Sequence, residues 1–172
     1  ATSALIVGQD PYPTTDTDGA LHASGLAFSV QESPETGGAN RRPRPTLRNI
    51  FKAAGTPDCS TSDLRPWAAQ GVLLINRALT VQRGGRAKTH QKAWASFLPA
   101  LAGEIAEARR AKSEALARAA GMKPAAAKTE AARGYGLPPL PVMLWGKDAQ
   151  NYALKMAAIP GAHVMEWGHP SP

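Results

Sequence analysis

A single carboxylate in a stiff turn is the first feature of this 172-residue sequence that could carry chemistry. Asp10 follows closely on the apolar run Ala4–Val7, within the stretch LIVGQDPYP. Pro11 removes a backbone donor that could have satisfied the carboxylate, and Pro13 fixes the following φ angle. A lone Asp-Pro is usually a turn residue. At the end of a buried strand, however, the carboxylate could also stabilise a neighbouring cation or hold a water molecule for attack.

Three further side chains could bind a flat, polar ligand. Asn76 closes the segment GVLLIN, and its amide offers one acceptor and a pair of donors to the edge of a base. Phe28, in GLAFSV, has an aromatic face that could stack on such a ligand, although most single phenylalanines belong to a core. His169, in GHPSP, is poorly placed for core packing, and it could be a surface residue, a ligand or a hydrogen-bond donor.

Four short apolar runs predict the strands that would position these residues. The runs are Ala4–Val7, Val72–Ile75, Val142–Trp145 and His163–Glu166. The first three are nearly continuous, which is typical of strands buried on both faces of a parallel sheet. In open α/β sheets, ligands bind outside the carboxyl ends of the strands. Here those ends deliver a carboxylate, two amides, an imidazole and a lysine to one edge, from Gln9, Asp10, Asn76, Lys147 and His169.

Helical patterns separate the predicted strands. Thr46 is a candidate cap for a helix of residues 46–54 that stops at Gly55. Apolar residues at helical spacing predict another helix from about Gln91. Between residues 109 and 139, Ala, Lys, Arg and Glu dominate, and this basic insertion is interpreted as an extended helix followed by a mobile, solvated excursion. The pattern predicts an α/β fold with a largely parallel sheet.

Bulk composition limits the classes of protein and partner. The length fits a single domain, residues 1–172. The net charge of +7 favours a polyanionic partner, although it could also serve only to keep the protein soluble. No apolar run is long enough to span a bilayer, so no membrane partner is expected. One cysteine cannot form an internal disulfide, which fits a cytoplasmic location. Neither a metal-ligand spacing nor a phosphate-binding glycine loop is present, so no metal or cofactor is expected.

Taken together, these segments resemble family 1 uracil-DNA glycosylase. GQDPYP resembles the motif that activates water, GLAFSV the segment that stacks on the base, and GVLLINRALTV the strand with the uracil-reading asparagine. VMLWGKDAQ is similar to a loop that grips the DNA backbone, and HPSP to the start of the motif with the catalytic histidine. The five motifs follow the family's order outside Arg109–Pro139. The resemblance implies a three-layer sandwich around a central, largely parallel four-stranded sheet.

The resemblance also implies a role for each matched residue. Asp10 would stabilise the cationic sugar and orient the attacking water, and His169 would donate to uracil O2. Uracil would be bound by Gln9, Tyr12, Phe28 and Asn76, and the DNA backbone by Thr46, Gly146, Lys147 and Ser171. The expected activity is hydrolysis of the uracil N-glycosidic bond in single- or double-stranded DNA, by a monomer, as the start of base excision repair.

Three departures from the family pattern modify these expectations. Pro13 stands where many relatives have histidine, and the basic insertion at 109–139 is longer than expected. The chain also lacks the family's N-terminal helices and stops at Pro172, before the leucine that relatives insert into the duplex, so we expect truncation at both ends and a preference for single-stranded substrate. Three arginines near Thr46 predict steeper salt dependence of DNA binding, namely Arg41, Arg42 and Arg44.

Two alternative functions stay open from the sequence. One is a mismatch glycosylase of broader specificity in the same superfamily, against which Tyr12 argues, because a pocket that accepts thymine needs a smaller residue. The other is a catalytically silent, truncated relative that holds uracil or DNA without cutting. The presence of Asp10, Asn76 and His169 together favours an active enzyme.

Overall fold

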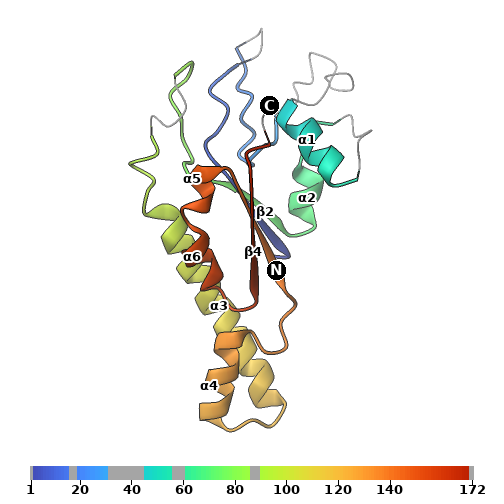
Figure 1. Ribbon diagram of the computed structural model, residues 1–172, viewed down its shortest axis with the longest axis vertical. Coiled ribbons are helices and arrows are strands. Elements are labelled where there is room, and N and C mark those ends of the chain that lie inside the picture. The colour runs from blue at the N-terminus through green and yellow to red at the C-terminus, as the bar shows by residue number, and fades with distance from the viewer. Residues whose placement is uncertain (1, 16–18, 31–44, 56–60, 86–89, 171–172) are drawn as a thin grey trace.

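A four-stranded sheet between two layers of helices forms the body of the molecule (Figure 1). The computed structural model describes residues 2–15, 19–30, 45–55, 61–85 and 90–170. The strands are β1 (Ala4–Gly8), β2 (Val72–Asn76), β3 (Leu140–Trp145) and β4 (Ala162–Trp167). They pair in the order β2-β1-β3-β4, and every pairing is parallel. The predicted three-layer α/β sandwich with a parallel sheet is therefore confirmed, and all four predicted strands are present.

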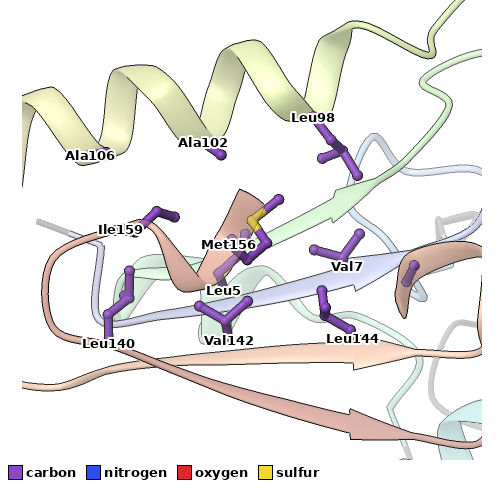
Figure 2. Close-up of a cluster of buried hydrophobic side chains, with 11 residues drawn as sticks. Leu5, Val7, Leu98, Ala102, Ala106, Leu140, Val142, Leu144, Met156 and Ile159 are labelled. Atoms are coloured by element: carbon purple, nitrogen blue, oxygen red, sulfur yellow. The ribbon is translucent and has the colours of Figure 1, made fainter. Parts of the chain in front are cut away.

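The described helices are α1 (Pro45–Ala53), α2 (Arg65–Ala69), α3 (Phe97–Ala119), α4 (Pro124–Arg133), α5 (Lys147–Gln150) and α6 (Ala153–Ala157). The first helical layer, which contains α3 and α6, packs on one face of the sheet. Leu5 and Val7 of β1, with Val142 and Leu144 of β3, form a buried cluster beneath α3 and α6 (Figure 2). Each of these aliphatic side chains contributes about 1.5–3 kcal/mol on burial, so this cluster anchors the two central strands.

The second helical layer covers the opposite face. Ile6 points away from Leu5 and Val7, as alternation along a strand requires, and it packs with residues of α1 and α2. Phe51 of α1 meets Trp67 of α2 edge to face, with ring centroids 5.9 Å apart. Because both faces are covered, the central strands carry apolar residues at successive positions, which explains their nearly continuous apolar sequence.

The Ala-rich segment forms a helical hairpin rather than a mobile excursion. The latter half of α3 continues through residue 119, and α4 packs beside it at the end of the molecule opposite the strand-end loops (Figure 1). Ala117, Ala127 and Ala131 are buried between the helices, where small side chains allow close approach. Ser113 also donates from its hydroxyl to the carbonyl of Tyr135, at 2.8 Å. The expectation of mobility overlooked this alanine interface.

Two helix starts differ from the predictions. Helix α3 begins at Phe97 rather than near Gln91, and residues 90–96 form turns, because Gln91 and Trp94 hydrogen-bond to the segment after β2. Helix α1 begins at Pro45, a residue type favoured in the first turn, so Thr46 lies inside the helix rather than capping it. No helix in the described part of the chain has the length and apolar character needed to cross a membrane.

Candidate active site

The carboxyl ends of β1 and β2 are joined side by side at one edge of the sheet. The backbone N–H of Arg77 donates to the Gly8 carbonyl at 2.9 Å, and that of Ala78 donates to the Gln9 carbonyl at 3.1 Å. Gly8 has no room for a side chain, since a Cβ there would collide with the side-chain oxygen of Asn76 and lie 3.1 Å from ring carbons of Phe28. A glycine at this position therefore lets three segments converge.

A cavity of about 470 Å³ opens at this edge. Its volume falls within the range of about 300–1,000 Å³ that is usual for small-molecule sites. Seven of the ten residues predicted to act on uracil or DNA line it, namely Gln9, Asp10, Tyr12, Phe28, Thr46, Asn76 and His169. The structure thus brings together residues from the segment after β1, from β2, from α1 and from the segment after β4, as expected for the carboxyl edge of a parallel sheet.

One wall of the cavity is built around Phe28. This residue has a φ of 67°, a left-handed conformation that is uncommon for a bulky side chain and that occurs mainly where surrounding contacts enforce it. Trp145, at the end of β3, meets its ring edge-on with centroids 5.1 Å apart. The Tyr12 hydroxyl donates to the Phe28 carbonyl at 3.4 Å. The ring is therefore fixed as one surface of the cavity.

His169 lies on another side of the cavity, with its ring centroid 6.4 Å from that of Phe28. The chain after it is held to α1, because the Asn49 amide donates to the Pro170 carbonyl at 2.6 Å. Partial burial lowers the pKa of His169 below its ordinary 6.5, and the negative charges of Asp10 and Asp148 oppose this shift. At neutral pH the imidazole is therefore mostly uncharged and can donate one hydrogen bond.

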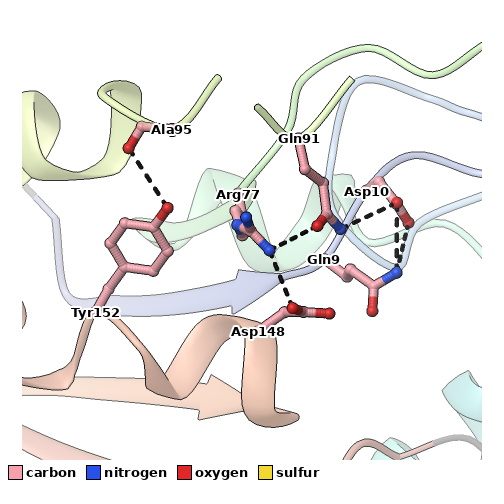
Figure 3. Close-up of polar contacts among 7 residues, drawn as sticks. All are labelled: Gln9, Asp10, Arg77, Gln91, Ala95, Asp148 and Tyr152. Atoms are coloured by element: carbon pink, nitrogen blue, oxygen red, sulfur yellow. Dashed lines mark hydrogen bonds and ion pairs between the residues drawn. The ribbon is translucent and has the colours of Figure 1, made fainter. Parts of the chain in front are cut away.

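Asp10 receives hydrogen bonds from two glutamines. The Gln9 amide nitrogen lies 3.3 and 3.4 Å from the two carboxylate oxygens, and the Gln91 amide nitrogen lies 3.5 Å from Oδ2. Gln91 in turn accepts from the Arg77 guanidinium at 2.7 Å, and the same Arg77 nitrogen donates to Asp148 at 3.0 Å (Figure 3). The carboxylate thus stands at the end of a chain of polar contacts.

Sequence reasoning missed Arg77, Gln91 and Asp148. Arg77 directly follows the last residue of β2, and Asp148 lies shortly after the end of β3, so the position of both at strand ends was an available signal. Gln91 had no such signal, because it sits in the turns before α3 and reaches the site only through the folded chain.

Of the four residues predicted to hold the DNA backbone, three are described, and only one of these is found in the lining of the cavity. Thr46 lines the cavity. Gly146 lies outside the cavity lining but in contact with the histidine, since a Cβ there would be 3.1 Å from a ring carbon of His169. Lys147 is exposed at the first position of α5. Ser171 falls outside the described residues, as do Arg41, Arg42 and Arg44.

The chemistry available in this cavity is that of one carboxylate, one largely neutral imidazole and side-chain amides beside an aromatic face. Among the described residues, no group of three or more His, Cys, Asp and Glu lies together in a way that could hold a metal ion. The arrangement suits a planar heterocycle that stacks on Phe28 while its polar edge meets Asn76.

Comparison with known proteins shows the family of the chain. A family model described as "Uracil DNA glycosylase superfamily" matches residues 1–172. The chain belongs to this superfamily. The uracil-DNA glycosylase resemblance carried by the sequence motifs is confirmed by that match and by the relatives below, whereas the roles of individual residues remain predictions.

Two bacterial relatives show the extent of the similarity to known uracil-DNA glycosylases. The chain is 38% identical to "Uracil-DNA glycosylase 1" of Streptomyces coelicolor and 37% identical to "Uracil-DNA glycosylase" of Thermobifida fusca, over 98% of its own length in both cases. It spans only 58% and 57% of those two proteins. The match therefore covers this chain almost entirely and little more than half of each relative.

Solved structures of superfamily members support the fold. A crystal structure of mimivirus uracil-DNA glycosylase superposes with a TM-score of 0.69 at 22% identity, covering 99% of this chain and 50% of that one. A variant of the mimivirus protein "in complex with UGI" superposes with a TM-score of 0.65 at the same identity, over 51% of its length. At this level of identity the similarity shows that the fold is shared.

Proposed function

We propose that the protein hydrolyses the N-glycosidic bond of uracil in DNA. The observation that carries the proposal is the meeting of Asp10, Asn76 and His169 with Phe28 around one cavity, in a chain of the uracil-DNA glycosylase superfamily. The printed names of the two bacterial relatives support the same activity. The alternative of a catalytically silent relative has no comparable support, because Asp10, His169 and Asn76 all line the same cavity.

Recognition would begin with uracil leaving the base stack, at a cost of a few kcal/mol. The base would then stack on the fixed Phe28 ring and present O4 and N3–H to the Asn76 amide. Cytosine shows the reversed donor and acceptor pattern there, and each buried unpaired polar group costs about 1–3 kcal/mol. Tyr12 would occupy the space that a thymine methyl group requires. These two residues would make the pocket specific for uracil.

Bond cleavage would place opposite charges in two parts of the pocket. As the C1′–N1 bond breaks, its electron pair leaves with uracil, and the sugar gains oxocarbenium character as in glycoside hydrolysis. The Asp10 carboxylate would stabilise that cation and accept a proton from the water that attacks C1′. The neutral imidazole of His169 would donate to uracil O2, where negative charge collects. The proton taken up by Asp10 would then pass through solvent to the uracil anion, which leaves free uracil and an abasic site as the products.

The substrate would be a uracil-containing DNA strand, gripped through its phosphates next to the cavity. Thr46 lines the cavity, while Gly146 and Lys147 directly follow β3, and Gly146 lies against the His169 ring. With Ser171, they would fix the register of the strand without reading its sequence. The net charge of +7 favours association with a polyanion of this kind.

The proposal is tested by uracil release from a single-stranded oligonucleotide that contains one uracil. The wild type should release the base, and Asp10→Asn should be slower by about 10²-fold or more, the range that a positioned acid–base group supplies. Asp63→Asn is the matched control, because this carboxylate pairs with Arg65 outside the cavity. Binding of the oligonucleotide without release by the wild type would identify a silent module instead.

A further inference from the structure

Four polar side chains form a continuous chain from the surface of α5 to the cavity. Asp148 accepts from Arg77 Nη1 at 3.0 Å, Arg77 Nη1 also donates to Gln91 Oε1 at 2.7 Å, and Gln91 Nε2 donates to Asp10 Oδ2 at 3.5 Å (Figure 3). We name these residues the polar chain. Burial increases toward its middle, where Gln91 is only 6% exposed.

The direction of the Gln91 amide is determined by Arg77. A guanidinium has donors only, so the group of Gln91 that faces it must be the carbonyl oxygen. The amide nitrogen then faces Asp10, whose ionised carboxylate has acceptors only. With the amide reversed, N–H groups would meet the guanidinium and two oxygens would meet at Asp10. Arg77 and Asp10 therefore select the same orientation of the Gln91 amide, with its N–H donor toward the carboxylate.

Arg77 is itself held from three sides. Its backbone N–H donates to the Gly8 carbonyl at the end of β1, at 2.9 Å. Its guanidinium carbon lies 5.9 Å from the centre of the Tyr152 ring. Asp148 neutralises its charge, and the side chains of this ion pair are only 15% and 23% exposed. Replacing a buried ion pair by apolar residues is often neutral for stability, so fold stability alone is a weak reason for this arrangement.

The segment that carries Gln91 is fixed on both sides as well. The Trp94 indole N–H donates to the Thr80 hydroxyl at 2.8 Å, and Thr80 is also bonded to His90 at 2.9 Å. The Tyr152 hydroxyl donates to the Ala95 carbonyl at 3.4 Å (Figure 3). These contacts keep the turns before α3 against the strand ends, so Gln91 approaches Asp10 from a rigid support.

We propose that Gln91 is a positioning residue for Asp10, and that Arg77, held by Asp148, fixes the direction of its amide. The inference rests on the proposed function, since it assigns the polar chain to the carboxylate that would act on the sugar and the water. A carboxylate that rotates about its Cβ–Cγ bond no longer presents a fixed oxygen to those groups. Misplacement of a reacting group by 1 Å can cost about 10²-fold in rate.

The test compares kcat and KM for uracil release by wild type, Gln91→Leu and Arg77→Met. We expect kcat to fall at least about tenfold in both variants while KM stays within about twofold, because neither side chain is expected to touch the base. The double variant should lose no more than the larger single loss, since Arg77 acts through Gln91. Arg77→Lys retains a cationic donor and should recover part of the rate.

Two further variants separate positioning from folding. Gln91→Glu keeps the size of the side chain and its contact with Arg77 but turns an oxygen toward Asp10, so kcat should fall, and its melting temperature is compared with that of Gln91→Leu. Arg109→Met removes a comparable arginine far from the cavity and should lower the melting temperature without changing kcat. If the wild type releases uracil and kcat is unchanged in Gln91→Leu and Gln91→Glu, the role of Gln91 is overturned while the proposed function stands. Absence of release by the wild type would overturn the proposed function and this inference with it.

Discussion

The imidazole of His169 lies against a residue that has no side chain. Gly146 has a φ of 85°, and a Cβ there would come within 3.1 Å of the His169 ring. We expect Gly146→Ala to lose about 1–3 kcal/mol of stability from the strained backbone. We also expect a loss of about tenfold or more in kcat, because the imidazole must move. Chemical denaturation and single-turnover uracil release would measure the two effects.

Gly55 provides the matched control for that substitution. It has a φ of 75° just after α1, and among the described residues, its chain neighbours aside, no atom lies within 4 Å of the position of its Cβ. Gly55→Ala should therefore carry a similar backbone strain but leave kcat at the wild-type value. Equal losses of kcat in the two variants would mean that the contact with His169 has no bearing on catalysis.

The protonation of His169 depends on its burial and on the negative charges beside it. Burial lowers its pKa below 6.5, whereas the charges of Asp10 and Asp148 raise it. A histidine titration followed by NMR should give a midpoint below 6.5 for the wild type. Asp10→Asn should lower that midpoint further, because it removes a negative charge that favours the imidazolium. Asp63→Asn, outside the cavity, should leave the midpoint unchanged.

The same shift determines how stability depends on pH. Because the pKa of His169 is lower in the folded state, the unfolded chain binds more protons below pH 6.5. The contribution of His169 to stability is thus complete above pH 6.5 and is lost as the pH falls from there through the folded-state pKa. Acidification should destabilise the wild type more than His169→Gln, as measured by the free energy of unfolding at several pH values.

Exclusion of thymine depends on the Tyr12 ring in the proposed pocket. The ring lines the cavity and is braced by its hydroxyl contact with the Phe28 carbonyl at 3.4 Å. Tyr12→Ala should release thymine at a rate well above the wild-type background, since space for a methyl group becomes available. Tyr12→Phe keeps the ring and should still exclude thymine. Thymine release by the Phe variant as well would assign the exclusion to the hydroxyl group instead.

At the scale of elements, the strands and their ends were predictable from the sequence. Strands β1, β2 and β3 are nearly continuous apolar runs, because helices cover both faces of the sheet, and these runs identify them in the sequence. Parallel pairing then brings the residues after β1, β2 and β4 to one edge, which predicted the meeting of Asp10, Asn76 and His169. Local sequence was sufficient here because the apolar runs identify the strands, and the helical connections between them allow parallel pairing.

The start of α3 and the polar chain were not predictable in the same way. The helical spacing of apolar residues continues through Trp94, yet the helix begins at Phe97. The intervening turns exist because Gln91 and Trp94 bond to Arg77 and Thr80, which are far away in the sequence. Such side-chain contacts override local helix propensity, and no pattern within the segment indicates them.

An arginine of α3 ties two loops at the base of the sheet. Arg109 donates from Nε to the Pro160 carbonyl at 2.6 Å and from Nη2 to the Pro138 carbonyl at 2.7 Å. Hydrogen bonds from charged groups contribute about 1.5–3 kcal/mol, so Arg109→Met should lose about 2 kcal/mol after allowance for solvent exposure. Urea denaturation would measure this loss. A loss below about 0.5 kcal/mol would mean that water replaces the guanidinium at both carbonyls.

Across the whole molecule, the loops at the carboxyl ends of the strands, whose residues line the cavity, and the α3–α4 hairpin lie at opposite ends (Figure 1). The 23 residues of α3 span about 35 Å at 1.5 Å per residue, which separates the tip of the hairpin from the strand-end loops. Basic residues occur both in the hairpin and in the sequence shortly before Thr46. Only the charges close to a bound strand can release its counterions, so the two groups of basic residues should act differently.

Salt dependence of DNA binding distinguishes these two groups. Arg41, Arg42 and Arg44 shortly precede Thr46 in the sequence, and Thr46 lines the cavity. Replacing Arg41, Arg42 and Arg44 by Ala should make the slope of log K against log salt shallower by about 2 for single-stranded DNA, since each phosphate that is no longer neutralised reduces the slope by about 0.7.

The matched variant removes three cations from the hairpin, namely Arg118, Lys123 and Lys128. Both variants lower the net charge of +7 by the same amount, so a difference between them must come from position. We expect the hairpin variant to keep the wild-type slope, because its residues lie too far from the cavity to touch a strand bound there. Fluorescence anisotropy of a labelled single strand at several salt concentrations measures both slopes. Equal reductions would show that the DNA responds to total charge, and a reduction only in the hairpin variant would place the DNA path along α3 and α4.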